Sequence, residues 1–407
     1  MISKRAGEPC IIQMFRQGGL TTPVLRHAGP QFDENVLLTR GPLAGMHAPA
    51  RFACAVAAVS LLSARTLDAQ TLDRRQIERI EQTLRQEGQE VVALANAAAA
   101  GEPVPGEFTL SWHNDYLKAQ TGTFIPFMVL LQAKSGQADA ALLYVRATRS
   151  RPDADDSDRG RSRRTTPPVA AYPFEEIYPV ALVPGQPVRI TRGCSLSPGR
   201  YDLTVVVRER ERPDARGSRR AAAVLRQTLE VPDFSSNDFT TSTVMLADAL
   251  TVLPGPPAEH ELSERPYVIG NREVQPAADS LLRPSEELIV VLLVYNPAVT
   301  PAKHFDLEVE YHFFRKNRAG ERGSGPGVSA GVAALAGERY FNRTEPQRFN
   351  PVILGPTFDP AAGQPVLAGQ GVPLAGFPAG EYRLFIRVSD LVAGRSLERH
   401  VTFTVLQ

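Results

Sequence analysis

The spacing of apolar residues changes once along the chain, near residue 108. Between residues 72 and 94, apolar side chains recur among polar ones at roughly helical spacing. From Phe108 onward, apolar and polar residues alternate in short runs that are separated by clusters of turn-forming residues. The pattern therefore predicts a helical segment over 70–104, followed by many short strands.

The predicted helical segment contains an internal glycine, Gly88, at which it can divide into two helices. The predicted helix is amphipathic, because its apolar side chains form one face, as in a helix that packs on a neighbouring layer. We expect this face to pack on the domain that follows, and a helix of a partner is the alternative.

The alternating part of the chain predicts fifteen strands. In the first half they are expected at 108–112, 124–132, 140–148, 178–182, 187–191, 201–208 and 223–231. In the second half they are expected at 241–250, 267–269, 287–295, 305–314, 339–342, 372–374, 382–388 and 399–406. Loops of hairpin size separate most of them, rather than crossover helices, which implies antiparallel pairing and an all-β fold.

The stretch "VPDFSSNDF" at 231–239 combines a proline with a polar cluster, as a linker does. It divides the alternating region into two predicted domains, 105–232 and 237–407. The insertion 149–168, with alternating charge, is predicted to be a solvated loop. This insertion and the glycine-rich insertion 317–337 are both candidates for mobile loops at strand ends.

A phrase near the C-terminus repeats one that lies 181 positions earlier: "SPGRYDLTVVVRE" starts at residue 197 and "PAGEYRLFIRVSD" at residue 378. The aligned pairs are Gly199 with Gly380, Tyr201 with Tyr382, Leu203 with Leu384, Val205 with Ile386, and Val207 with Val388. The apolar positions are two apart, so one face of each strand is predicted to enter a core. In both copies a further strand follows, and each copy is predicted to be the hairpin that closes a domain.

In the repeat, a glycine that can take a positive φ angle precedes a tyrosine whose hydroxyl can return to a nearby backbone group. This arrangement resembles the tyrosine corner of tandem immunoglobulin and fibronectin type III-like sandwich modules of exported bacterial proteins. Gly199, Tyr201, Gly380 and Tyr382 are then structural corner residues, and the resemblance covers about 108–407. It implies two antiparallel immunoglobulin-like β-sandwiches preceded by a short α-helical segment, with Leu203 and Leu384 in place of the second core cysteine.

The stretch "LLRPSEELIVVLLVYNPAV" at 281–299, with the closing hairpin, also resembles the C-terminal sandwich of exported bacterial proteins named for a Gly-Trp-x-Thr-Asp signature. The signature itself is absent, because the single tryptophan, Trp112, is followed by His113. This second resemblance implies an envelope-associated β module, and a sandwich fold does not by itself imply a function.

Met46 opens a segment with a basic residue, an apolar run of about thirteen residues and small residues near Gln70, which is the pattern of a secretory signal peptide. The run is shorter than the roughly twenty residues of a membrane span. We therefore expect a signal peptide at 46–69, a disordered, non-native extension at 1–45, and an exported protein, periplasmic or extracellular, without a transmembrane segment. A buried N-terminal helix of a cytosolic protein is the alternative.

Charge and cysteine content remove several classes of function. The net charge is +1, with 45 basic and 44 acidic residues, so no overall field attracts nucleic acid. Of the three cysteines, only Cys194 lies after the predicted signal peptide, which excludes an intramolecular disulfide in the mature chain. We expect a structural role for Cys194.

Motifs for catalysis or metal binding are incomplete. "GVSAG" around Ser329 has the spacing of a nucleophile elbow, but glycine-rich loop flanks it in place of a strand and a helix. The acidic run 153–158 lacks the glycine and glutamate of a calcium loop. His304 and His312 lie about 27 Å apart if the strand is straight. We predict no catalytic residue, no cofactor and no metal.

Aromatic clusters are the last candidates. Trp112, Tyr116, Phe314 and Tyr340 lie beside polar residues, as on a sugar-binding face, and the alternative is that the rings fill the core. We therefore predict a non-enzymatic protein that acts in protein–protein interaction or structural presentation, through loops at strand ends or a sheet edge. A carbohydrate-binding module is the first alternative, and an enzyme with an unrecognised site is the second.

Overall fold

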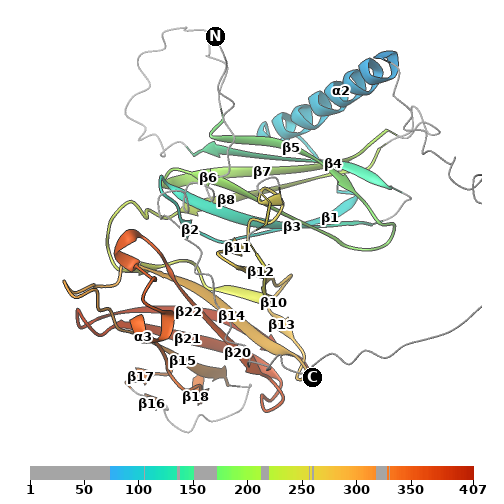
Figure 1. Cartoon of the computed structure of the whole chain (residues 1–407). Helices are drawn as coiled ribbons and strands as arrows, with labels where there is room; N and C mark the ends of the chain where they lie inside the picture. The colour runs from blue at the N-terminus through green and yellow to red at the C-terminus, as the bar shows by residue number, and fades with distance from the viewer. Residues whose placement is uncertain are drawn as a thin grey trace, which may run out of the picture. The chain divides into compact units, whose positions relative to one another are not determined.

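The computed structural model describes residues 74–104, 106–134, 138–150, 172–211, 220–255, 257–258, 261–317, 328–329 and 331–407 (Figure 1). The predicted extension 1–45, the predicted signal peptide 46–69 and the acidic run 153–158 lie outside these ranges. Of the described residues, those from 87 onward belong to one compact unit and residues 74–86 belong to another. No helix in the described part of the chain is long and apolar enough to cross a membrane.

The described strands confirm the predicted all-β fold, because one helix is followed by antiparallel sheets that pack as immunoglobulin-like sandwiches. In the first sandwich, drawn in cyan and green in Figure 1, one sheet contains β1 (Phe108–Asn114), β2 (Leu117–Lys118), β3 (Thr123–Ala133) and β6 (Val188–Leu196). The other has the order β5 (Phe174–Ala181), β4 (Ala140–Arg149), β7 (Gly199–Glu209) and β8 (Ala222–Val231). Its core draws buried side chains from both sheets, all of them between Phe108 and Val231.

The second sandwich is drawn from yellow to red (Figure 1). One sheet has the order β11 (Val268–Ile269), β12 (Arg272–Pro276), β10 (Met245–Val252), β14 (Glu287–Tyr295) and β20 (Val366–Pro373), and β9 (Thr240–Thr241) also pairs with β14. The other has the order β13 (Leu281–Leu282), β22 (Arg395–Val405), β21 (Gly380–Asp390), β15 (Leu307–Lys316) and β18 (Glu338–Arg343), and β19 (Gln347–Phe349) also pairs with β15. Only β13 and β22 pair in parallel among the described strands. The buried residues of this core lie between Phe239 and Val405.

The strands of the structure differ from the predicted ones at several places, and three of the differences have a clear physical reason. The predicted strand 241–250 is divided between β9 and β10, because the Ser242 hydroxyl accepts from the Leu293 backbone N–H and interrupts the ladder there. The predicted strand 372–374 is only the end of β20, whose two glycines resemble turn residues. β12 was not predicted, because it alternates charged and polar residues with only one aliphatic side chain, Val274.

The helix α2 (Arg74–Ala99) continues through Gly88, so the break allowed for at that position is wrong. Glycine is not needed there either, because an added Cβ would meet Ile177 at an ordinary distance of 3.5 Å. From Glu87 onward the helix packs on the outer face of the sheet that contains β4 and β7. The contact is apolar, and its buried residues are Val91 and Ala95 on the helix with Leu142, Tyr144 and Val206 on the sheet.

Polar contacts fix both ends of this helical contact. The buried Glu87 carboxylate accepts from Arg210 Nε at 3.0 Å and from the Glu211 backbone N–H at 2.8 Å. At the other end, Arg146 donates to the Ala95 carbonyl oxygen at 3.2 Å. A cation beside the C-terminal carbonyls of a helix is favourable. The predicted packing of the helix on the following domain is therefore confirmed for residues from Glu87 onward.

A different segment covers the corresponding outer face of the second sandwich. The hairpin of β16 (Val328–Ser329) and β17 (Val332–Ala333) places Val332 against Phe314 and Phe385, and Tyr340 packs beside them. Within the glycine-rich insertion 317–337, Val332 is buried by this contact. Apolar side chains at the outward positions of β15 and β21 give the segment a surface on which to pack.

The repeated phrase forms the closing hairpin of each sandwich, β7 with β8 and β21 with β22. The Tyr201 hydroxyl donates to the Ser197 carbonyl at 2.8 Å, and the Tyr382 hydroxyl donates to the Pro378 carbonyl at 2.6 Å. The φ angles are +141° at Gly199 and +153° at Gly380, which residues with a side chain rarely adopt.

Each tyrosine corner also contains an arginine, which the alignment of the two repeated phrases did not identify. Arg149 on β4 lies opposite Tyr201 and donates to the Pro198 carbonyl at 3.3 Å. Arg315 on β15 lies opposite Tyr382 and donates to the Ala379 carbonyl at 2.9 Å. In each copy, the arginine covers the glycine on the side where a Cβ would otherwise lie.

Candidate functional site: the junction of the sandwiches

The first sandwich contacts the second through a third apolar cluster. Its buried residues are Leu117, Ala119 and Phe124 from the first sandwich and Met245, Ala247, Tyr267, Val274, Val291, Leu293 and Tyr295 from the second. Alternation along β14 explains the composition, because Val291, Leu293 and Tyr295 point away from the core of their own sandwich. The apolar face that they form is covered by the first sandwich.

Backbone and hydroxyl groups cross this junction. The Tyr116 N–H donates to Thr243 Oγ1 at 3.0 Å, and the Thr243 N–H donates to the Tyr116 carbonyl at 3.2 Å. The Lys118 N–H donates to the Tyr295 hydroxyl at 3.1 Å. These bonds give partners to backbone groups of Tyr116 and Lys118, which would otherwise be without a hydrogen bond at the contact.

The same connection places a carboxyl group in the junction. Thr243 Oγ1 donates to Asp115 Oδ1 at 2.9 Å, and the Tyr267 hydroxyl, which donates to the Pro126 carbonyl at 3.3 Å, also acts on this carboxyl as a hydrogen-bonding neighbour. Burial raises the pKa of Asp115 to about 6, although both hydrogen bonds act in the opposite direction. Burial, and then the neighbouring Asp115, raise the pKa of Tyr267 above its ordinary value.

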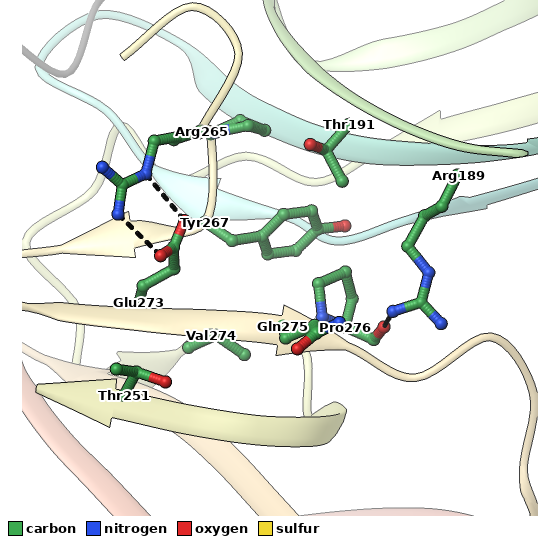
Figure 2. A pocket seen from close by; sticks show the side chains of 10 residues that line it. Arg189, Thr191, Thr251, Arg265, Tyr267, Glu273, Val274, Gln275 and Pro276 are labelled. Atoms are coloured by element: carbon green, nitrogen blue, oxygen red, sulfur yellow. Dashed lines mark hydrogen bonds and ion pairs between the residues drawn. The ribbon is translucent and has the colours of Figure 1, made fainter. Parts of the chain in front are cut away.

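A pocket of 280 Å³ lies beside the junction, lined by Arg189 and Thr191 of β6 and by residues of β10, β12 and the turn before β11. Figure 2 shows the Tyr267 ring between two arginines. Arg265 holds Glu273 with two bonds of 2.9 and 2.7 Å, and Arg189 donates to the Pro276 carbonyl at 3.0 Å. Arg189 of β6 therefore joins the first sandwich to the second, whereas Arg265 is bonded within the second sandwich, and the chain's own acceptors occupy both donors.

The candidate chemical groups do not come together in the described residues. No group of three His, Cys, Asp or Glu side chains there could hold a metal ion. His304 is exposed before β15, whereas His312 is buried against the Phe385 ring at 6.0 Å between centroids. Ser329 lies in the two-residue strand β16, which a turn connects to β17, and so the strand–turn–helix context of a nucleophile elbow is not found.

Cys194 lies on β6 with its side chain in the first core. Burial, and then the nearby Glu176, raise the pKa of its thiol to about 12. A thiol that stays protonated at neutral pH is a poor nucleophile. Its position therefore agrees with a structural role.

The four aromatic residues considered for sugar binding take part in packing. Trp112 is buried, with its ring stacked on Phe127 at 4.1 Å between centroids. Phe314 is fully buried, and the half-buried Tyr340 meets it edge to face at 5.9 Å. Tyr116 is half-buried against the first core. Each ring is thus in contact with other side chains of its own sandwich.

An exposed apolar loop, which the sequence reasoning missed, lies in the second sandwich at α3 (Pro351–Leu354). Val352 is 92% exposed and Ile353 57% exposed, whereas their neighbour Leu354 packs on the core. The signal was present in "NPVILG", because Asn before Pro starts a helix and Gly ends it. An apolar turn closed at both ends in this way was a candidate for display at the surface.

The fold defines a class of protein, the all-β protein with immunoglobulin-like sandwiches. No family model matches the chain, and no curated protein matches it. Solved structures that match include red sea bream transglutaminase, with 12% identity and a TM-score of 0.19 over 76% of this chain and 33% of that one.

Two bacterial alpha-2-macroglobulins match in the same way. A mutant from Salmonella has 12% identity and a TM-score of 0.22 over 75% of this chain and 25% of that one. The E. coli protein in its native conformation has 11% identity and a TM-score of 0.19 over 75% and 16%. The chain spans a third or less of the length of these structures. TM-scores this low carry no argument about function.

Proposed function

We propose that this chain is an exported, non-enzymatic β-sandwich protein that acts by protein–protein interaction or structural presentation in the bacterial envelope. The observation that carries the proposal is the exposed apolar turn at Pro351–Leu354, which is a loop at strand ends of the kind expected to make contacts. The carbohydrate alternative has no comparable support, because Trp112 and Phe314 are buried.

The turn is held in one conformation by its own polar groups. Asn350 Oδ1 accepts from the Val352 N–H at 3.0 Å and from the Ile353 N–H at 3.1 Å. The Gly355 N–H donates to the Pro351 carbonyl at 3.1 Å. A surface that is already ordered loses little conformational entropy on binding, so more of its contact energy appears as affinity.

The neighbouring charges favour an apolar partner over an anionic one. Arg348, shortly before the turn, pairs with Asp306 through a bond of 2.9 Å, and Asp359, shortly after it, lies 3.7 Å from Lys303. These charges therefore cancel in pairs. Burying two aliphatic side chains is worth about 3–6 kcal/mol, which is enough to anchor a contact in an apolar pocket of another protein.

The test uses tagged residues 70–407 as bait against an envelope extract of the source organism, with insoluble polysaccharides in parallel. We expect a stoichiometric protein partner that, once purified, binds the natural chain but not the double variant Val352→Asp, Ile353→Asp. Val252→Asp is the matched control, because Val252 is also exposed, at 59%, but lies on β10. Equal binding by the double variant, or retention on polysaccharide alone, would contradict the proposal.

A further inference from the structure

The Asp115 carboxyl group lies where the two sandwiches meet. Asp115 is in the connection between β1 and β2 of the first sandwich. Its hydrogen-bond partners come from the second sandwich: Thr243 lies between β9 and β10, and Tyr267 lies just before β11. The Asp115 N–H donates to the Pro126 carbonyl at 3.0 Å, which holds the connection against β3.

The groups around this carboxyl are neutral. Thr243 contributes a hydroxyl, and the titratable groups that face Asp115 are the phenols of Tyr267 and of its neighbour Tyr116. The charged group that acts on His113, two residues earlier, is Asp279 and not Asp115. A carboxylate that loses water without gaining a cation is unfavourable in its charged form. The contact therefore favours the protonated acid.

We propose that this junction is a pH-sensitive joint, which is closed tightly while the Asp115 carboxyl is protonated and loosens when that carboxyl ionises. Each sandwich has a hydrophobic core of its own, so the contact can weaken without unfolding either one. The backbone bonds made by Tyr116, Lys118 and Thr243 would then open more often, because they cross the same contact between the sandwiches.

The direction follows from the shift of the pKa. In the closed junction the pKa of Asp115 is about 6, above its ordinary value of 3.8, so closure binds a proton. The stabilisation is complete below the ordinary value and is lost as the pH rises through about 6. Between pH 8 and pH 5, linkage predicts that the closing equilibrium rises about tenfold.

Amide hydrogen exchange of the full chain tests the joint. Protection factors, corrected for the intrinsic pH dependence of exchange, are measured for Tyr116, Lys118 and Thr243 at pH 5 and pH 8. We expect them to be about tenfold larger at pH 5. Core amides such as Val205 and Ile386 report global unfolding and should not change in parallel.

Variants separate this carboxyl from other groups. Asp115→Asn mimics the protonated acid, so its junction amides should be protected equally at both pH values. Thr243→Val removes a hydroxyl that favours the charged form, so the midpoint should move to higher pH, and Thr243→Ser should restore it. Asp248→Asn, which removes an exposed partner of Arg189 at the same junction, should leave the pH dependence unchanged.

A direct titration completes the test if a variant fails to fold. The carboxyl carbon of Asp115 in the natural chain is followed by NMR, and a midpoint near 6 is expected. A midpoint near the ordinary value, or pH-dependent protection that persists in Asp115→Asn, would overturn the proposal.

Discussion

The two sandwiches close with the same hairpin but cover its outer face in different ways. In the first, α2 lies on β4 and β7 with Val91 and Ala95 in an apolar contact. In the second, the β16–β17 hairpin and Tyr340 lie on β15 and β21. The inward faces of β7 and β21 are thus alike in the two sandwiches. Their outward faces differ, because a different segment packs on each.

The coverings also differ in their charges. Over the second sandwich, Arg383 holds Glu338 with bonds of 3.0 and 2.7 Å, and both side chains are less than a tenth exposed. Over the first, the Arg210 partner of Glu87 is about one-third exposed. Removal of one partner of a buried ion pair lowers the stability of the fold strongly, whereas removal of one partner of a pair exposed to water has a small effect.

The largest predicted effect is loss of one partner of the buried pair. Arg383→Met should lower the free energy of unfolding of the second sandwich by about 3–5 kcal/mol, because the Glu338 carboxylate stays buried without its cation. Arg210→Met should lower that of the first sandwich by about 1–2 kcal/mol, since solvent compensates in part. Trp112, the only tryptophan, reports unfolding of the first sandwich by fluorescence, and circular dichroism follows both.

A second variant separates charge burial from lost packing. The double change Arg383→Met, Glu338→Leu removes both charges and should recover most of the lost stability. If the double variant is as unstable as the single one, side-chain packing and not the buried charge stabilises the contact between β18 and β21.

The next effect compares the two corner glycines. Gly380→Ala and Gly199→Ala both force alanine into a strained φ angle, which costs about 1–3 kcal/mol. At Gly380 the added Cβ would lie 2.9 Å from Nε of the buried Arg315, whereas at Gly199 it meets the exposed Arg149 at 3.2 Å. The arginine can move away only at Gly199, so Gly380→Ala should be worse by about 1 kcal/mol.

Urea unfolding followed by the same two signals measures this difference. The companion variants Arg315→Met and Arg149→Met show whether the arginine causes it, because each removes the group that the new methyl would meet. Equal losses at the two glycines would mean that backbone strain alone sets the penalty.

Alternation along the sequence predicted the strands whose inward and outward faces differ. β14 matches its predicted range of 287–295, and Tyr311 and Phe313 enter the core as their spacing requires. Alternation of apolar and polar residues did not predict the strands that tertiary contacts define. β12 has no apolar alternation of its own and is stabilised as a neighbour of β10.

The junction was not predictable from one sequence, because its parts are distant along the chain. Asp115 and Thr243 are 128 residues apart, and neither belongs to a motif. The buried positions of Trp112 and Phe314 were foreseen as the alternative to sugar binding, because alternate rings on a strand fill a core. The arginines of the corners were missed, since they lie on other strands and at a different offset from the repeated phrase.

The smallest effect tests whether the repeated tyrosines are equivalent. Tyr201→Phe and Tyr382→Phe each remove one hydroxyl that donates to a backbone carbonyl four residues earlier. Both rings remain buried, so each variant should lose about 1 kcal/mol, the net contribution of one hydrogen bond. Equal losses, each confined to its own sandwich, would show that the corner acts locally and independently of the outer covering. A loss at Tyr382 well above that at Tyr201 would instead mean that the ring cluster around Phe377 and Phe403 depends on the hydroxyl for its position.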